Sequence, residues 1–120
     1  MKSLFSSISN AIQGIMYVFK REKNFKIQLC IALVVICISL FFQISRVEWL
    51  FILSLIFLVL SLELLNSAFE KITDILKPRL HEQIKVVKDI SAGMVFIFSI
   101  GSCCIGGYIF YPYVIELFLK

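Results

Sequence analysis

Three long apolar stretches divide the chain. They cover residues 29–44, 49–69 and 90–115, and the only charge within them is Glu63. Each stretch approaches the roughly 20 residues that an α-helix needs to cross the hydrocarbon core of a bilayer. The pattern therefore predicts an all-α membrane protein with transmembrane helices over about 27–45, 48–70 and 86–113.

The segment before the first predicted span has a different pattern. Its apolar side chains recur at steps of three and four, with serine, asparagine and glutamine between them; they are Leu4, Phe5, Ile8, Ile12, Ile15, Met16 and Phe19. This spacing is typical of an amphipathic helix, and the segment lacks the apolar core and cleavage site of a secretory signal. We expect residues 1–24, approximately, to form a helix that lies on the membrane surface.

Composition supports a single membrane domain over residues 1–120. The 120 residues are 60% hydrophobic, and the mean hydropathy of +0.96 excludes an ordinary soluble globular domain. Four cysteines lie inside the predicted spans without nearby histidine, which favours burial in apolar packing over a zinc site; they are Cys30, Cys37, Cys103 and Cys104. Three short helices provide little core, so we expect a homo-oligomer that buries helix faces between subunits.

Basic residues are concentrated before the first span and between the second and third. They are Lys2, Lys20, Arg21, Lys23, Lys26, Lys71, Lys77, Arg79, Lys85 and Lys88. Only Arg46 and Lys120 belong to the other side of the predicted membrane. The positive-inside rule therefore predicts a cytoplasmic amino terminus and second loop, with the carboxyl terminus outside. Without a groove of interleaved exposed aromatic residues, the positive charge does not indicate nucleic-acid binding.

A stripe of polar residues interrupts the second span. Glu63, Asn66, Glu70 and Asp74 are spaced by three, four and four residues, so they share one helix face, and Ser67 lies beside the asparagine. Carboxylates at membrane depth are costly and are retained for function or for pairing between helices. Glu63 lies roughly 10 Å deeper than Glu70 at about 1.5 Å per residue. Such a stripe is suited to bringing a soluble ligand to a lipid headgroup.

Two further polar clusters are predicted at the same membrane face. Glu22 and Asn24 precede the first span, and Lys88 and Asp89 precede the third, followed by the small residues 91–93. Carboxylates with a lysine at a water boundary suit phosphoryl transfer, because Mg²⁺ needs oxygen ligands and phosphate charge must be neutralised. Since the chain lacks GxxxxGK[ST] and protein-kinase motifs, such a site would be built from helix ends. Ordinary polar contacts between helices remain the alternative.

Three of these stretches together resemble a known family. "ELLNSAFEKITD" (63–74), "KDISAG" (88–93) and "REKNFKIQ" (21–28) resemble the prokaryotic diacylglycerol kinases, a family that includes the undecaprenol kinases of Gram-positive bacteria. The resemblance covers nearly the whole chain in order. It implies a small homotrimeric kinase of the bacterial cytoplasmic membrane that transfers the γ-phosphate of ATP to a lipid hydroxyl, with active sites shared between neighbouring subunits.

The resemblance also implies roles for individual residues. The catalytic positions are Glu63, as general base, and Asn66. The nucleotide positions are Glu22, Glu70, Lys88 and Asp89, of which Glu22 and Glu70 also bind Mg²⁺. The lipid-substrate positions are Glu63, Ser67 and Phe69, and Phe69 is larger than the isoleucine common in the motif.

Departures from the family pattern bear on the substrate. Gln28 stands where histidine is common in Gram-positive members and glutamate in Gram-negative ones. The stretches "VEWLFILSLIFLV" and "GGYIFYP" are more similar to the undecaprenol kinases, so undecaprenol is the expected substrate and diacylglycerol the alternative. Two other classes fit the composition: a small proton-coupled transporter that uses Glu63, and a membrane subunit without catalysis.

Overall fold

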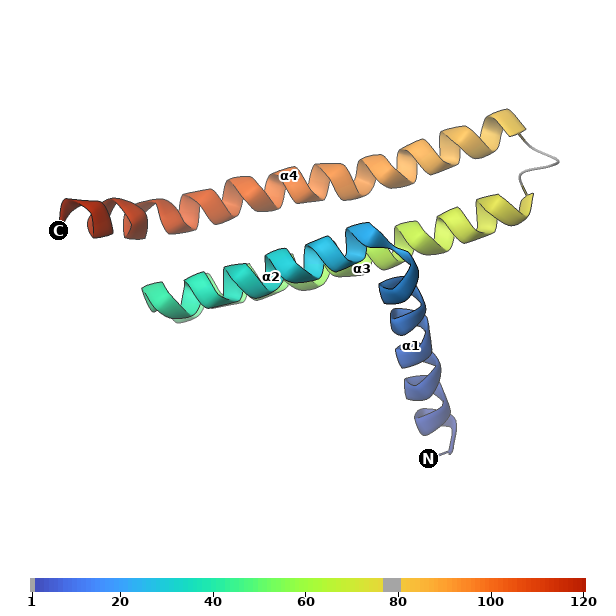
Figure 1. Ribbon diagram of the computed structural model, residues 1–120, viewed down its shortest axis with the longest axis horizontal. Coiled ribbons are helices and arrows are strands. Elements are labelled where there is room, and N and C mark those ends of the chain that lie inside the picture. The colour runs from blue at the N-terminus through green and yellow to red at the C-terminus, as the bar shows by residue number, and fades with distance from the viewer. Residues whose placement is uncertain (1, 77–80) are drawn as a thin grey trace.

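The computed structural model describes residues 2–76 and 81–120, and this part of the chain contains four helices (Figure 1). They are α1 (Lys2–Arg21), α2 (Lys23–Phe42), α3 (Arg46–Leu76) and α4 (His81–Leu119). The prediction of an all-α chain with three long apolar helices is confirmed, because α2, α3 and α4 are each long and apolar enough to cross a membrane. Lys77 and Arg79, used above to predict orientation, lie outside the described residues.

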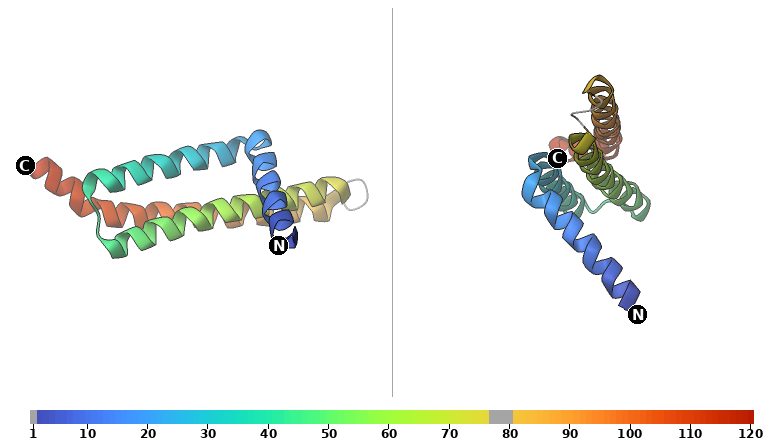
Figure 2. Two further views of the ribbon diagram at one scale, coloured as in Figure 1. Left: turned by 90° about the horizontal axis from the view of Figure 1, so that it is seen from below. Right: turned by 90° about the vertical axis from the view of Figure 1, so that its right-hand side faces the viewer.

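The two longest helices continue beyond the predicted spans. α3 ends at Leu76 and not near residue 70, and α4 covers His81–Leu119 and not 86–113. Polar residues end an apolar span without ending a helix, because Glu, Lys and Asp side chains are compatible with helical backbone in water. Pro112 lies inside α4, and the carboxyl-terminal part of this helix turns away from the rest (Figure 2).

A tight turn joins α2 to α3. Gln43 ends α2 in the left-handed conformation with φ 52°, and its backbone N–H donates to the Leu40 carbonyl at 3.3 Å. Ser45 then caps α3. Its Oγ accepts from the Glu48 N–H at 3.2 Å, and its own N–H donates to Glu48 Oε1 at 2.9 Å. This reciprocal pair satisfies donors at the start of the helix and fixes the direction of α3.

The apolar core lies at the α2–α3 turn end of the bundle. Ile44, Ile52 and Ile109 are buried there, and the ring of Phe42 packs against Phe110 and Tyr113. The Tyr113 hydroxyl donates a hydrogen bond to Glu48, which connects α4 to the start of α3. α3 packs most extensively against α4, whereas α1 runs across the direction of the other helices (Figures 1 and 2).

Most of the span surface is exposed in the single chain. Only 11–17% of the most apolar part of each span is buried. The prediction that the cysteines are buried is wrong for this chain, since Cys30, Cys37, Cys103 and Cys104 are all free and exposed. These positions stay exposed because the small core takes only a few residues from each helix.

Candidate functional site

Glu63 is buried in the middle of α3, with 3% of its surface exposed. Its Oε2 accepts a hydrogen bond of 3.3 Å from Gln28 Nε2 of α2. The other polar atom of that amide, Gln28 Oε1, is buried and has no hydrogen-bond partner in the described part of the chain. The predicted deep glutamate is therefore held by α2, next to an acceptor that is still available.

Asn66 lies one turn further along α3 and connects it to α4. Its Oδ1 accepts a 2.5 Å hydrogen bond from Ser91 Oγ, and its Nδ2 donates to Glu70 Oε1 at 3.4 Å. Ser67 is also buried, and its Oγ has no partner among the described residues. Phe69, by contrast, is exposed, so the predicted lipid-contact residues Ser67 and Phe69 lie in different environments.

The carboxylates of Glu22 and Glu70 come from separate elements and lie close enough to interact electrostatically. Glu70 is half-buried on α3, and Glu22 occupies the cap position before α2. Burial raises the pKa of Glu22, and the negative charge of Glu70 raises it further. A divalent cation between them would relieve this repulsion, and two carboxylate oxygens are suitable ligands for Mg²⁺. Within the described residues no group of three or more His, Cys, Asp or Glu side chains gathers, so the remaining ligands would come from phosphate and water.

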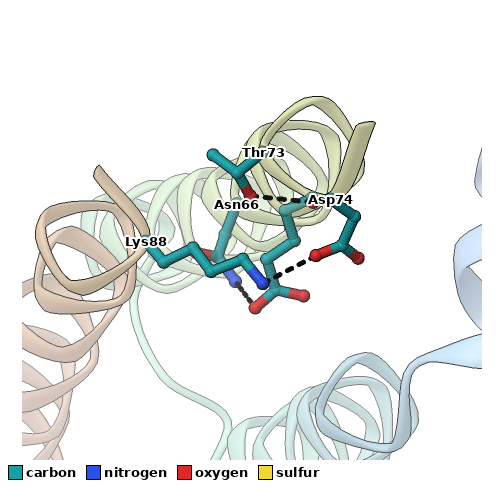
Figure 3. A network of polar contacts seen from close by, with 5 residues as sticks. Asn66, Thr73, Asp74 and Lys88 are labelled. Atoms are coloured by element: carbon teal, nitrogen blue, oxygen red, sulfur yellow. Dashed lines mark hydrogen bonds and ion pairs between the residues drawn. The ribbon is translucent and has the colours of Figure 1, made fainter. Parts of the chain in front are cut away.

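The outer end of the stripe is closed by an ion pair between helices. Lys88 Nζ of α4 lies 2.7 Å from Asp74 Oδ1 of α3, as Figure 3 shows. Within α3, Thr73 Oγ1 donates a 2.9 Å hydrogen bond to the backbone carbonyl of Glu70. Asp89 instead pairs with Lys85 at 2.9 Å on an exposed face of α4. The structure thus brings Lys88 to the stripe, whereas Asp89 points to a different partner.

Two residues of this network were not assigned a role from the sequence. In the sequence, Gln28 is noted only as a departure from a family pattern, and Ser91 only as one of the small residues 91–93. Gln28 connects α2 to Glu63, and Ser91 connects α4 to Asn66. A signal for Ser91 was present, because it lies three residues after Lys88 and so shares its helix face.

Comparisons with known proteins agree on one family. A family model described as prokaryotic diacylglycerol kinase matches residues 9–110. The chain is 36% identical over 112 residues to an undecaprenol kinase of Bacillus subtilis, covering 93% of this chain and 91% of that protein. It is 33% identical over 94 residues to a diacylglycerol kinase of Haemophilus influenzae (78% and 80% covered) and 29% identical over 116 residues to one of Synechocystis (96% and 66%). The matched range contains every site residue described above.

Proposed function

This chain belongs to the prokaryotic diacylglycerol kinase family and is a lipid kinase, and from this premise we propose that it transfers the γ-phosphate of ATP, with Mg²⁺, to the hydroxyl of undecaprenol. The proton-coupled transporter has no support from the family match. Beyond family membership, the proposal names the acceptor lipid and gives a role to each site residue.

The observation that carries the proposal is the continuous polar stripe on α3. It begins at buried Glu63, passes through Asn66 and Glu70, and ends at the Lys88–Asp74 ion pair. A soluble nucleotide meets the outer end of the stripe, while the deep end lies among apolar residues where a lipid alcohol resides. Each end thus has the polarity that its substrate requires.

Glu63 acts as the general base in this mechanism. The lipid hydroxyl oxygen attacks the γ-phosphorus, its proton passes to the Glu63 carboxylate, and the bond between the γ-phosphorus and the bridging oxygen of the β-phosphate breaks to release ADP. Gln28 holds the Glu63 carboxylate in position through its Nε2, so that a Glu63 oxygen can accept the single proton of the incoming hydroxyl. Asn66 fixes Glu70 relative to α4.

Glu22, Glu70, Lys88 and Asp89 bind the nucleotide. Glu22 and Glu70 would hold Mg²⁺, and the bound ion would neutralise the negative charge of the phosphates. The ammonium group of Lys88 contacts the transferred phosphate. To do so, it leaves Asp74 and donates to a phosphate oxygen instead. The nucleotide contact of Asp89 rests on the family resemblance alone, since Asp89 pairs with Lys85 on an exposed face of α4.

Two observations support a long-chain acceptor. An apolar groove with a volume of about 360 Å³ lies among α2, α3 and α4; it starts at Gln28, beside Glu63, and extends to Phe110. The B. subtilis relative named undecaprenol kinase is also matched over 93% of this chain at 36% identity. In this proposal Ser67 and Phe69 contact the lipid near its hydroxyl.

We place the protein in the bacterial cytoplasmic membrane as a homotrimer with active sites shared between subunits. The amino terminus and the α3–α4 connection are cytoplasmic, the carboxyl terminus is outside, and α1 lies on the membrane surface. The large exposed apolar surface of the single chain supports association of this kind. The transverse direction of α1 supports its interfacial position (Figure 1).

The test is a kinase assay with defined lipids. Purified protein is supplied with Mg-ATP and with undecaprenol, diacylglycerol or ceramide, and the phosphorylated lipid is quantified. Undecaprenol should be phosphorylated with the highest kcat/KM. Preference for diacylglycerol would correct the acceptor while leaving the site roles intact, and ATP consumption independent of every lipid would contradict the proposed reaction.

A further inference from the structure

Two cationic side chains meet at one tyrosine where the end of α1 lies beside α3. Lys71 Nζ of α3 donates a 3.1 Å hydrogen bond to the Tyr17 hydroxyl. The guanidinium carbon of Arg21 lies 4.5 Å from the centre of the Tyr17 ring, and Lys71 Nζ lies 5.6 Å from the same centre. Tyr17 thus holds both cations over a single exposed patch, here called the Tyr17 cluster.

The positive charge of this cluster is not balanced by ion pairs. Among the side chains that the structure describes, neither Arg21 nor Lys71 forms an ion pair with a carboxylate, whereas Lys85 and Lys88 pair with Asp89 and Asp74. The hydrogen bond from Lys71 lowers the pKa of Tyr17, and the positive charges of Arg21 and Lys71 lower it further. Desolvation and the negative charge of Glu22 raise this pKa, but the net shift is downward. Two like charges held close together repel, and a bound anion would relieve that repulsion.

The surroundings of the Tyr17 cluster combine positive charge with exposed apolar side chains. Met16 and Phe19 of α1 are exposed next to it, and Lys26 Nζ lies 5.7 Å from the Phe19 ring centre. α1 extends from this corner across the direction of the other helices (Figure 2). A surface that has both apolar and cationic groups fits the interface of a leaflet that contains anionic lipid.

We propose that Tyr17, Arg21 and Lys71 bind the phosphate of an anionic phospholipid from the surrounding leaflet. Arg21 and Lys71 donate hydrogen bonds to the phosphodiester oxygens, and Tyr17 keeps the two donors together. This site uses other side chains than the proposed nucleotide site but borders it, because Arg21 precedes Glu22 and Lys71 follows Glu70 in the sequence. The inference rests on the proposed position of α1 at the membrane surface and is independent of which lipid is phosphorylated.

The test first measures lipid binding in the absence of undecaprenol, diacylglycerol and ATP. Purified protein in neutral detergent is titrated with phosphatidylglycerol or phosphatidylcholine, and bound lipid is counted by native mass spectrometry. Arg21→Gln and Lys71→Gln should each weaken phosphatidylglycerol binding about fivefold, and the double variant about 30-fold. Arg21→Lys and Lys71→Arg keep the charge and should keep most of the affinity. Arg46→Gln is the matched control, because it removes an exposed positive charge at the other end of α3.

Three results would overturn the proposal. Unchanged phosphatidylglycerol binding in the double variant would show that the Tyr17 cluster does not bind the lipid. An equal loss of binding in Arg46→Gln would show that only the net charge of the protein matters. The titration is then repeated with ATP and with inorganic phosphate. If the glutamine variants bind ATP more weakly but still bind phosphatidylglycerol normally, the cluster belongs to the nucleotide site. Circular dichroism checks folding, and the charge-keeping variants preserve the test if a glutamine variant unfolds. Because no substrate alcohol is used, failure here leaves the proposed reaction unaffected.

Discussion

Replacing Glu63 with glutamine separates a catalytic base from a contact between helices. The amide has nearly the size of the carboxylate, and its oxygen can still accept the hydrogen bond from Gln28 Nε2 that the structure shows at 3.3 Å. What the variant loses is the ability to accept a proton. If Glu63 is the base, Glu63→Gln should therefore lower turnover strongly while the chain still folds, assembles and binds ATP.

The contacts around Glu63 indicate the size of both effects. General base catalysis contributes typically about 10²- to 10⁴-fold, so kcat should fall within that range. The free energy of unfolding should change by no more than about 1 kcal/mol, because one neutral hydrogen bond replaces one to a buried carboxylate. Removing a buried charge can even stabilise a bundle, so a small increase in stability is compatible with the mechanism.

The assay combines lipid phosphorylation, ATP affinity and thermal unfolding on the same protein sample. Glu48→Gln is the matched control: it changes another α3 glutamate, one that Tyr113 and Ser45 hold at the far end of the helix. This control should keep its turnover. Near-normal turnover in Glu63→Gln, with or without altered stability, would refute the catalytic role and leave Glu63 as a group that pairs α3 with α2.

Four other substitutions address Glu70 and the residues around the stripe. Glu70→Gln and Glu22→Gln should each raise the Mg²⁺ concentration needed for half-maximal activity, since an amide is a poorer ligand for a hard cation; an unchanged Mg²⁺ titration in both would exclude the metal role. Lys88→Met should raise KM for ATP far more than KM for lipid, because only the nucleotide carries phosphate charge before transfer, and equal increases would indicate a structural pair with Asp74. Ser91→Ala should destabilise the protein by about 1–3 kcal/mol in thermal or denaturant unfolding, because it leaves buried Asn66 Oδ1 without its donor; unaltered stability would show that water replaces the hydroxyl.

The sequence predicts the helices and the stripe more reliably than the contacts between helices. Long uncharged runs specify spans almost independently of tertiary structure, and a spacing of three and four puts Glu63, Asn66 and Glu70 on one face of any helix. The partners of that face depend on how helices pack. Lys88 and Asp89 were expected to act together, but adjacent residues on a helix point in different directions, and the structure gives them Asp74 and Lys85 as separate partners.

Gln28 shows why a single polar residue near the start of an apolar helix is difficult to interpret. In the sequence it could mark a lipid-headgroup contact, a tolerated polar position or a functional contact. Only the crossing of α2 and α3 places its amide next to Glu63. Likewise, the exposure of the four cysteines follows from how few residues the small core takes from each helix.

The unequal lengths of α2 and α3 predict that the position of Glu63 depends on bilayer thickness. α2 has 20 residues and α3 has 31, which correspond to roughly 30 Å and roughly 46 Å at about 1.5 Å per residue. A hydrocarbon core of about 30 Å matches α2 and leaves part of α3 outside. Because Gln28 ties Glu63 to α2, a thicker membrane would place the Glu63 carboxylate further below the headgroups, and a thinner one would bring it closer to water. If Glu63 is the base, we therefore expect turnover to vary with the acyl-chain length of the host membrane.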